Sequence, residues 1–209
     1  MFRLFRHSPP NTPVLTHSEV QTAVPPAVEE LLGAEFHRNA PYRWARKGGD
    51  GWHEVFELRA WKGACLSPAW GLALDGVPHR SGDAAKWHRT LKSGQADIWV
   101  DWPEQRALSF LYGEAPLLQE ASDVLPRAVA KARGFWSSLK GREDFRAAHE
   151  TALRSTGGTA FGGALTHARH RVEAALSWSE GASELAEAAL AQVPGTDTAR
   201  EDFRRKVFR

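Results

Sequence analysis

The sequence contains one cysteine, Cys65, among 209 residues. A single thiol cannot form a disulfide within the chain, and it excludes a zinc site built from several cysteines. Cys65 lies between Ala64 and Leu66, a context typical of a small side chain that is buried as a hydrophobe. We therefore expect neither a disulfide framework nor a cysteine nucleophile.

Charge of one sign and long apolar runs are also scarce. The 27 lysines and arginines nearly balance the 25 aspartates and glutamates, so the net charge of +2 gives no global field that would favour nucleic acid or membrane. No stretch approaches the roughly 20 apolar residues of a membrane-spanning helix, and no membrane partner is expected. The N-terminal residues lack the apolar run of a signal peptide, which predicts a cytoplasmic location. Residues 1–13 are predicted to be a flexible arm because they include Pro9, Pro10 and Pro13.

Known catalytic and metal-binding motifs are missing as well. The Gly-rich residues 155–163 lack the Gly-Lys-Ser/Thr ending of a phosphate-binding loop, so a flexible connection between helices is favoured. His167, His170 and Glu173 have helical spacing but not the His-Glu-x-x-His order of zinc proteases, which favours a solvated helix face. We expect no metal and no cofactor.

What the sequence does contain, in residues 14–115, is two short helices followed by alternating strands. Thr16 and Glu19 fit a capping box, and a second helix is predicted from Pro26 to the residue before Gly33. A turn over residues 47–51 joins two strands, and pairing Lys47 with Gly51 would place Tyr42 opposite Phe56. One face of this hairpin is then aromatic and apolar, and the other is polar, with Arg43, His53, Glu57 and Arg59.

The third strand is predicted from Leu66 to Leu74. Its large side chains share one face and its small ones the other, the small set being Ala69, Gly71 and Ala73. Small residues allow another element to approach this face closely.

A second hairpin is predicted from Trp87 to Trp102, with a two-residue loop at Gly94 and Gln95. This register pairs Trp87 with Trp102 on an apolar face. On the opposite face it forms three pairs, namely His88 with Asp101, Thr90 with Trp99 and Lys92 with Asp97. A further strand over residues 107–112 would extend the meander.

From residue 116 onward alanine becomes frequent and the apolar spacing becomes helical. Helices are predicted over residues 122–136, 142–154, 165–178, 183–192 and 197–209. The fold class is therefore α+β, with a twisted antiparallel sheet of about five or six strands in the first half. The helical region, residues 116–209, is expected to pack on one face of this sheet and to form one compact unit with it.

Several of these segments resemble the bacterial family of unknown function DUF4304. They are the helix end Leu-Leu-Gly-Ala-Glu-Phe at residues 31–36, the Trp-Arg hairpin strands, the strand Trp70–Leu74 and the pair Phe135–Trp136. The resemblance covers roughly residues 26–192, but residues 86–90 have no counterpart in it. It implies a small accessory or immunity-type protein and supplies no catalytic residues.

The leading hypothesis for function is a non-enzymatic bacterial interaction protein, of an immunity or regulatory type, that binds a protein partner. Trp61 and Trp99 fall on the faces opposite the main apolar sets of their hairpins, and tryptophan is frequent at binding hot spots. They are predicted as exposed anchors in an apolar patch. The rival interpretation is a second layer of core that the C-terminal helices form on that face.

Two alternatives use the polar face of the second hairpin. In a phosphate-ester hydrolase or nuclease, His88 would be the base, Asp101 would orient it, and Lys86, Arg89 and Lys92 would contact the anion. In a nucleic-acid-binding protein, Trp99 would stack on a base. An ordinary solvated sheet face explains the same residues without chemistry.

Overall fold

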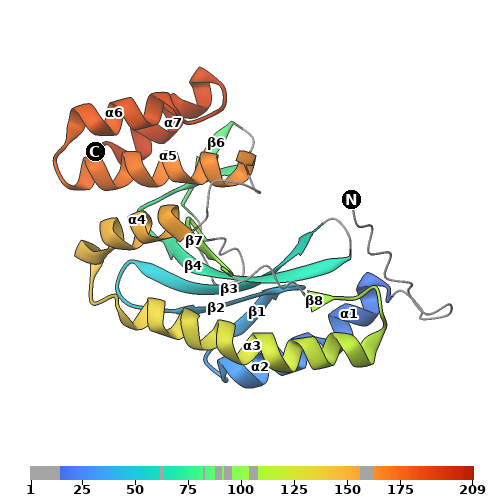
Figure 1. The fold of residues 1–209 in the computed structure, drawn as a ribbon. Coiled ribbons are helices and arrows are strands. Elements are labelled where there is room, and N and C mark those ends of the chain that lie inside the picture. Colours follow the sequence, from blue (N-terminus) through green and yellow to red (C-terminus); the bar gives the residue numbers. More distant parts are fainter. Residues whose placement is uncertain are drawn as a thin grey trace, which may run out of the picture.

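A computed structural model describes residues 15–61, 64–81, 83–87, 91, 96–103, 108–155 and 162–209. The predicted arm at residues 1–13 lies outside them. The centre of the molecule is an antiparallel sheet in the order β1-β2-β3-β4-β7, and β8 also pairs with β4 (Figure 1). Its strands are β1 (His37–Ala40), β2 (Arg43–Lys47), β3 (Trp52–Trp61), β4 (Cys65–Leu74), β7 (Ile98–Asp101) and β8 (Leu108–Ser109). A separate small hairpin consists of β5 (His79–Ser81) and β6 (Ala84–Lys86).

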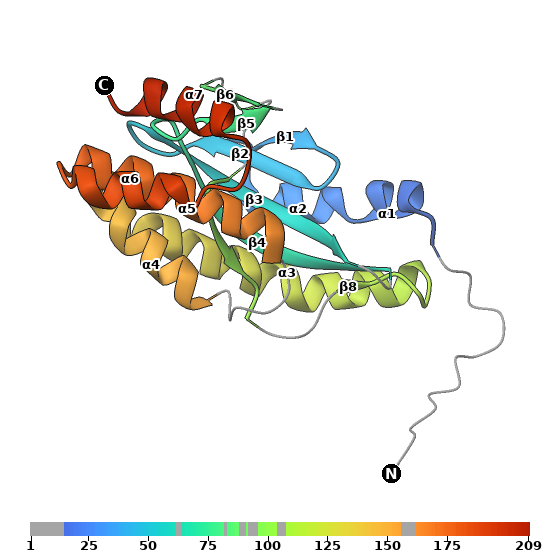
Figure 2. The ribbon, with the colours of Figure 1, turned by 90° about the horizontal axis from the view of Figure 1, so that it is seen from above.

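The helices lie on more than one side of this sheet, as Figures 1 and 2 show. One face is covered by α1 (His17–Ala23), α2 (Pro25–Leu32) and α3 (Glu114–Ser137). After a 3-10 turn, η1 (Arg142–Asp144), α4 (Phe145–Ser155) runs beside the edge strand β7. An outer layer on the side away from α3 consists of α5 (Gly162–Ser179), α6 (Ser183–Ala191) and α7 (Asp197–Val207). The predicted α+β class is confirmed, but the C-terminal helices do not all pack on one face.

The local signals at the first helices act as expected. Thr16 accepts a hydrogen bond from the Glu19 backbone N–H, and Glu19 accepts one from the Thr16 backbone N–H, which completes the capping box. Pro25 and Pro26 occupy the first turn of α2, and Gly33 ends it with a φ of 89°.

The two faces of β2 and β3 are as predicted, although the pairing is not. Trp44 lies opposite Phe56, and Lys47 lies opposite His53, so the register differs by two residues from the predicted one. The cause is a longer loop, in which the Trp52 ring packs against the backbone of Gly48 and Gly49. A shift of two residues keeps every side chain on its face, and the aromatic side remains buried.

Strand β4 separates two apolar clusters. Leu66, Trp70 and Leu72 belong to the main core, together with residues of α2 and α3. Ala69 and Ala73 belong to a smaller cluster on the other face, with Ala45, Val55, Ala96 and Trp99. The small residues predicted on that face do permit close approach, because a Cβ at Gly71 would overlap the Ile98 carbonyl oxygen.

The predicted second hairpin falls mostly outside the described residues, since 88–90 and 92–95 are not among them. Its register is therefore not tested. Its two ends are described, and they differ: Trp87 is 40% exposed, whereas Trp102 is buried and meets the Trp70 ring edge-on at 6.4 Å. Trp87 thus does not share the buried face predicted for the pair.

The first helix of the helical half begins earlier than residue 122, where it was predicted to start. A helix start at Ser122 or Asp123 would have placed Pro126 in the first turn, but α3 starts at Glu114 and carries Pro126 inside. The predicted strand at residues 107–112 is reduced to β8, which pairs with β4 rather than β7. Within the described ranges, no helix is both long and apolar enough to cross a membrane.

Candidate functional site

Only some of the residues that were predicted to form a site are among the described residues. His88, Arg89 and Lys92 lie outside the described residues, and so does the Trp61 side chain. Lys86 is exposed at the end of β6, and Trp99 and Asp101 are on β7. Whether the predicted set converges therefore stays untested.

Asp101 belongs to a row of ion pairs on the sheet face opposite α3. Its Oδ1 accepts a hydrogen bond from Arg59 Nη1 at 2.5 Å, and Arg43 Nη2 lies 3.1 Å from Glu57 Oε1. Burial lowers the pKa of Arg59 and raises the pKa of Asp101, and in each case the opposite charge of the partner resists the shift. The Asp101 carboxylate is thus already bound by a cation.

Trp99 is not an exposed anchor, and this part of the sequence prediction is wrong. Its side chain is 7% exposed within the smaller apolar cluster, and the Arg59 guanidinium lies 4.3 Å above its ring. Two features explain the burial: the small residues of β4 leave room for the ring, and Ala96 and Leu91 pack in the same cluster. The rival interpretation, a second layer of core, therefore applies to Trp99, although strand and loop residues supply this cluster.

A larger concavity lies elsewhere, between the tips of β3 and β4 and the C-terminal helices. This cleft has a volume of about 560 Å³, within the range of about 300–1,000 Å³ that is usual for ligand sites. Its apolar walls are formed by Leu74, Val77, Trp87, Phe145, Ala175, Leu176, Trp178 and Val207. Its polar lining is formed by Arg142, Glu143, Ser179 and Glu180.

Aromatic contacts fix the walls of the cleft. Phe145 packs edge-on against Trp52 at 5.5 Å, and Trp178 stacks on Phe208 at 4.6 Å with an angle of 12°. Trp87 is different, because 40% of its surface is exposed. The cleft therefore has a preformed aromatic wall on the helical side and an accessible indole on the other.

The floor of the cleft depends on hydrogen bonds between the residues that precede β3 and those that follow β4. Asp75 N–H donates to the Gly51 carbonyl at 2.9 Å, and Val77 N–H donates to the Leu74 carbonyl at 3.1 Å. Gly51 has a φ of 96°, a conformation that favours glycine, and a Cβ there would lie 2.6 Å from Arg142 Nε. The absence of a side chain at position 51 thus lets Arg142 lie across the rim.

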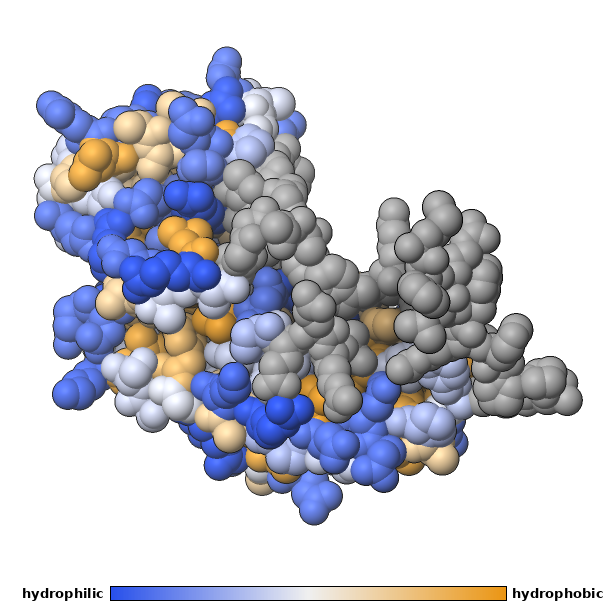
Figure 3. Space-filling model, in the orientation of Figure 1, coloured by the Kyte–Doolittle hydropathy of each residue, from blue (hydrophilic) through white to orange (hydrophobic). Residues whose placement is uncertain are grey.

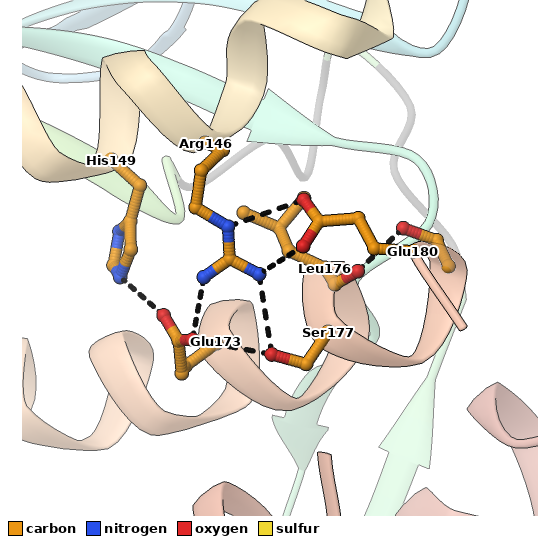
Figure 4. A network of polar contacts seen from close by, with 7 residues as sticks. Arg146, His149, Glu173, Leu176, Ser177 and Glu180 are labelled. Atoms are coloured by element: carbon orange, nitrogen blue, oxygen red, sulfur yellow. Dashed lines mark hydrogen bonds and ion pairs between the residues drawn. The ribbon is translucent and has the colours of Figure 1, made fainter. Parts of the chain in front are cut away.

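A network of charged groups joins α4 to α5 beside the cleft (Figure 4). The Arg146 guanidinium donates to both Glu180 oxygens, at 3.2 and 2.6 Å, and its Nη1 lies 2.5 Å from Glu173 Oε1. Ser177 Oγ also accepts from it at 3.2 Å. The hydrogen bonds that Arg146 donates to Glu180 and Glu173 hold its pKa above the ordinary value, and its burial only partly opposes this. Burial alone would raise the pKa of Glu173, but the hydrogen bond and charge of Arg146 lower it on balance.

His149 lies next to this network and is buried, with 3% of its surface exposed. Its Nε2 is 3.8 Å from Glu173 Oε2 and has no hydrogen-bond partner within the described part of the chain. Burial lowers its pKa to about 4, so the imidazole is neutral at pH 7. It borders a cavity of about 40 Å³ with Asp97, Trp99 and Arg169, which is too small for an organic ligand.

These groups do not form a recognisable catalytic set. Ser179 Oγ, in the cleft, donates to the Leu176 carbonyl at 2.8 Å rather than to a base. Cys65 lies at the far end of β4 from Leu74. Glu173 faces Arg146 and His149 of α4, and the described residues contain no cluster of three His, Cys, Asp or Glu side chains suited to a metal.

The visible surface in Figure 3 is mostly hydrophilic or mixed, and its hydrophobic areas are small and separate. The coloured part of that face therefore shows no broad apolar patch. Sequence reasoning missed the cleft because its lining comes from segments between residues 51 and 207. The available signals were Trp178 and Phe208, two aromatics outside the Trp-rich first half.

A scan against protein-family models finds no match, and neither a search of curated proteins nor one of solved structures finds a similar protein. The resemblance to DUF4304 remains a prediction.

Proposed function

We propose that this protein is a non-enzymatic binding protein that holds an apolar segment of a protein partner in the cleft. The observation that carries the proposal is the cleft of about 560 Å³, walled by Trp178 and Phe145 and entered past the exposed Trp87. Aromatic side chains in such pockets contribute most of the affinity at many protein interfaces.

The proposal keeps the interaction function expected from the sequence but moves the binding surface. The earlier candidate, Trp99, is buried under Arg59, whereas Trp87 has free surface beside a concavity. An immunity or regulatory role in a bacterial cell would use such a surface to grip one partner protein.

The alternatives have less support. The hydrolase hypothesis needs Asp101 to orient His88, yet the Asp101 carboxylate is bound by Arg59. The nucleic-acid hypothesis needs Trp99 to stack on a base, and that ring is covered. The arginines of α7 do not offer a free basic stripe either, since Arg200, Arg204 and Arg205 each pair with an acidic side chain.

Site-specific photo-crosslinking in cells of the source organism tests the proposal. A photoreactive phenylalanine analogue replaces Ser179 in the cleft, and a matched control replaces Leu118, which is 37% exposed on α3. We expect protease-sensitive adducts of higher mass from position 179 and far fewer from position 118. The additional substitution Trp87→Ala should reduce the adducts at least tenfold, because loss of an interface tryptophan typically weakens binding by about 2 kcal/mol or more.

Equal adducts at both positions would contradict the proposal. Adducts that nuclease removes and protease does not would favour the nucleic-acid alternative instead.

A further inference from the structure

The charges at the rim of the cleft point to the chemistry of its occupant, an inference that rests on the proposed function. The polar lining contains one cation, Arg142, and two carboxylates, Glu143 and Glu180. These groups differ in how strongly the protein already engages them.

Glu180 is already held by the protein itself. Both of its oxygens accept hydrogen bonds from the Arg146 guanidinium, at 3.2 and 2.6 Å. A bidentate pair of this kind satisfies the hydrogen-bonding geometry of the carboxylate, although Arg146 shares its charge with Glu173. The Glu180 oxygens that an occupant of the cleft would meet are therefore already hydrogen-bonded.

Arg142 is much less engaged. Its side chain is 66% exposed, and its described ion pair joins Nη2 to Asp50 Oδ2 at 3.6 Å, with the Asp50 side chain 99% exposed. A pair this long and this solvated holds the guanidinium weakly. The N–H donors of the Arg142 guanidinium, which lies above Gly51, therefore remain available to an occupant of the cleft.

Two more charges bear on the balance. Lys86, predicted from the sequence as an anion contact, is exposed but does not belong to the lining of the cleft. Glu143 opposes Arg142, but its carboxylate folds back against Gly141 of its own turn. Arg142 is thus the lining cation that remains open to an occupant.

We infer that the cleft recognises an acidic peptide segment, in which a large apolar side chain enters between Trp87 and Trp178 and a neighbouring carboxylate reaches Arg142. The apolar side chain supplies the buried apolar area of the contact. The bidentate guanidinium–carboxylate contact selects peptides with an acidic residue beside that side chain.

Three capped tetrapeptides test this inference, each with a Trp-Leu core flanked on both sides by glutamate, by glutamine or by lysine. Their affinities for the full chain are measured by isothermal titration calorimetry at low and at high salt. An exposed ion pair changes affinity by up to about fivefold, so the glutamate peptide should bind up to about fivefold tighter than the glutamine peptide. The lysine peptide should bind weakest, and high salt should reduce the differences.

Two glutamine variants locate the effect. Arg142→Gln should remove most of the preference for glutamate, while Glu143→Gln, on the same turn, should enlarge it. Circular dichroism of both variants confirms that they fold, which is expected because both side chains are exposed.

Equal affinities for the three peptides, or tightest binding of the lysine peptide, would overturn the inference and leave the proposed function standing. A glutamate preference that Arg142→Gln does not alter would overturn it too. If no peptide binds, the acidic-segment inference fails, and the photo-crosslinking at position 179 decides the proposed function separately.

Discussion

Where α3 meets the sheet, Leu125, Ala128 and Trp136 are buried in one apolar cluster with Trp70 and Leu72. Where α4 meets α5, apolar residues also pack, but the junction contains the Arg146 network and a neutral buried His149. Apolar burial depends little on pH and salt, whereas ion pairs and titrating groups depend on both. The difference teaches that pH and salt can weaken the contact between α4 and α5, beside the cleft, more than the apolar contact between α3 and the sheet.

The largest effect is expected from a substitution in the main apolar cluster of the sheet. Phe56 is fully buried, and its ring lies 6.4 Å from that of Trp44. Phe56→Ala should lower the free energy of unfolding by about 3–5 kcal/mol, because it removes burial and leaves a cavity. Guanidinium unfolding measures the loss at pH 7. Leu185→Ala, at a side chain that is 64% exposed, is the control and should change stability by less than about 0.5 kcal/mol.

A smaller effect should follow from acidification, and it should arise at the α4–α5 junction. Burial lowers the pKa of His149 to about 4 from its ordinary 6.5, so between these values the unfolded chain binds a proton that the folded protein does not. Stability is then lost as the pH falls from about 6.5 to about 4, by up to about 3 kcal/mol in total. The charged groups around the imidazole, Glu173, Arg146 and Arg169, are included in this shift.

Urea unfolding of the parent and of His149→Gln across this pH range isolates the histidine. Burial raises the pKa of Glu54 and Asp101, which acts in the opposite direction at low pH, but both proteins share those groups. The parent should lose more stability than the variant between pH 7 and pH 4. Parallel curves would show that His149 does not titrate as its burial implies.

The smallest of the three effects is expected from Arg146→Met, which keeps most of the aliphatic stem and removes the guanidinium. The pairs with Glu173 and Glu180 are partly exposed, so we expect a loss of about 1–2 kcal/mol, less at high salt. Hydrogen exchange should become faster in α5 while α2 and α3 stay protected. Uniformly faster exchange in both regions would break the comparison between them.

Much of the sheet was predictable because alternation in the sequence is local. The faces of β2, β3 and β4 follow from the parity of Trp44, Phe56, Leu66 and Leu72, and a loop two residues longer than predicted does not change parity. The loop length itself was not predictable, since it depends on how the Trp52 ring packs over two glycines. The start of α3 was missed because Gly113, its N-cap, has no side chain to signal it.

The candidate site was harder to predict from the sequence than the sheet was. Periodicity placed Trp99 opposite the apolar set, which is correct, but exposure depends on what covers that face. The cleft joins Gly51, Trp87, Phe145 and Trp178, and their proximity is set by the path of the chain over more than a hundred residues. No local pattern encodes that path.

The unequal exposure of the tryptophans makes the protein its own optical reporter. Among the indoles whose side chains are described, Trp87 has the largest solvent-accessible fraction, and Trp44, Trp52, Trp70, Trp99, Trp102 and Trp136 are all buried. Among these described indoles, Trp87 should therefore supply the most red-shifted emission component, the one that acrylamide quenches most readily. Because that component arises at the mouth of the cleft, its loss would register occupancy without any label.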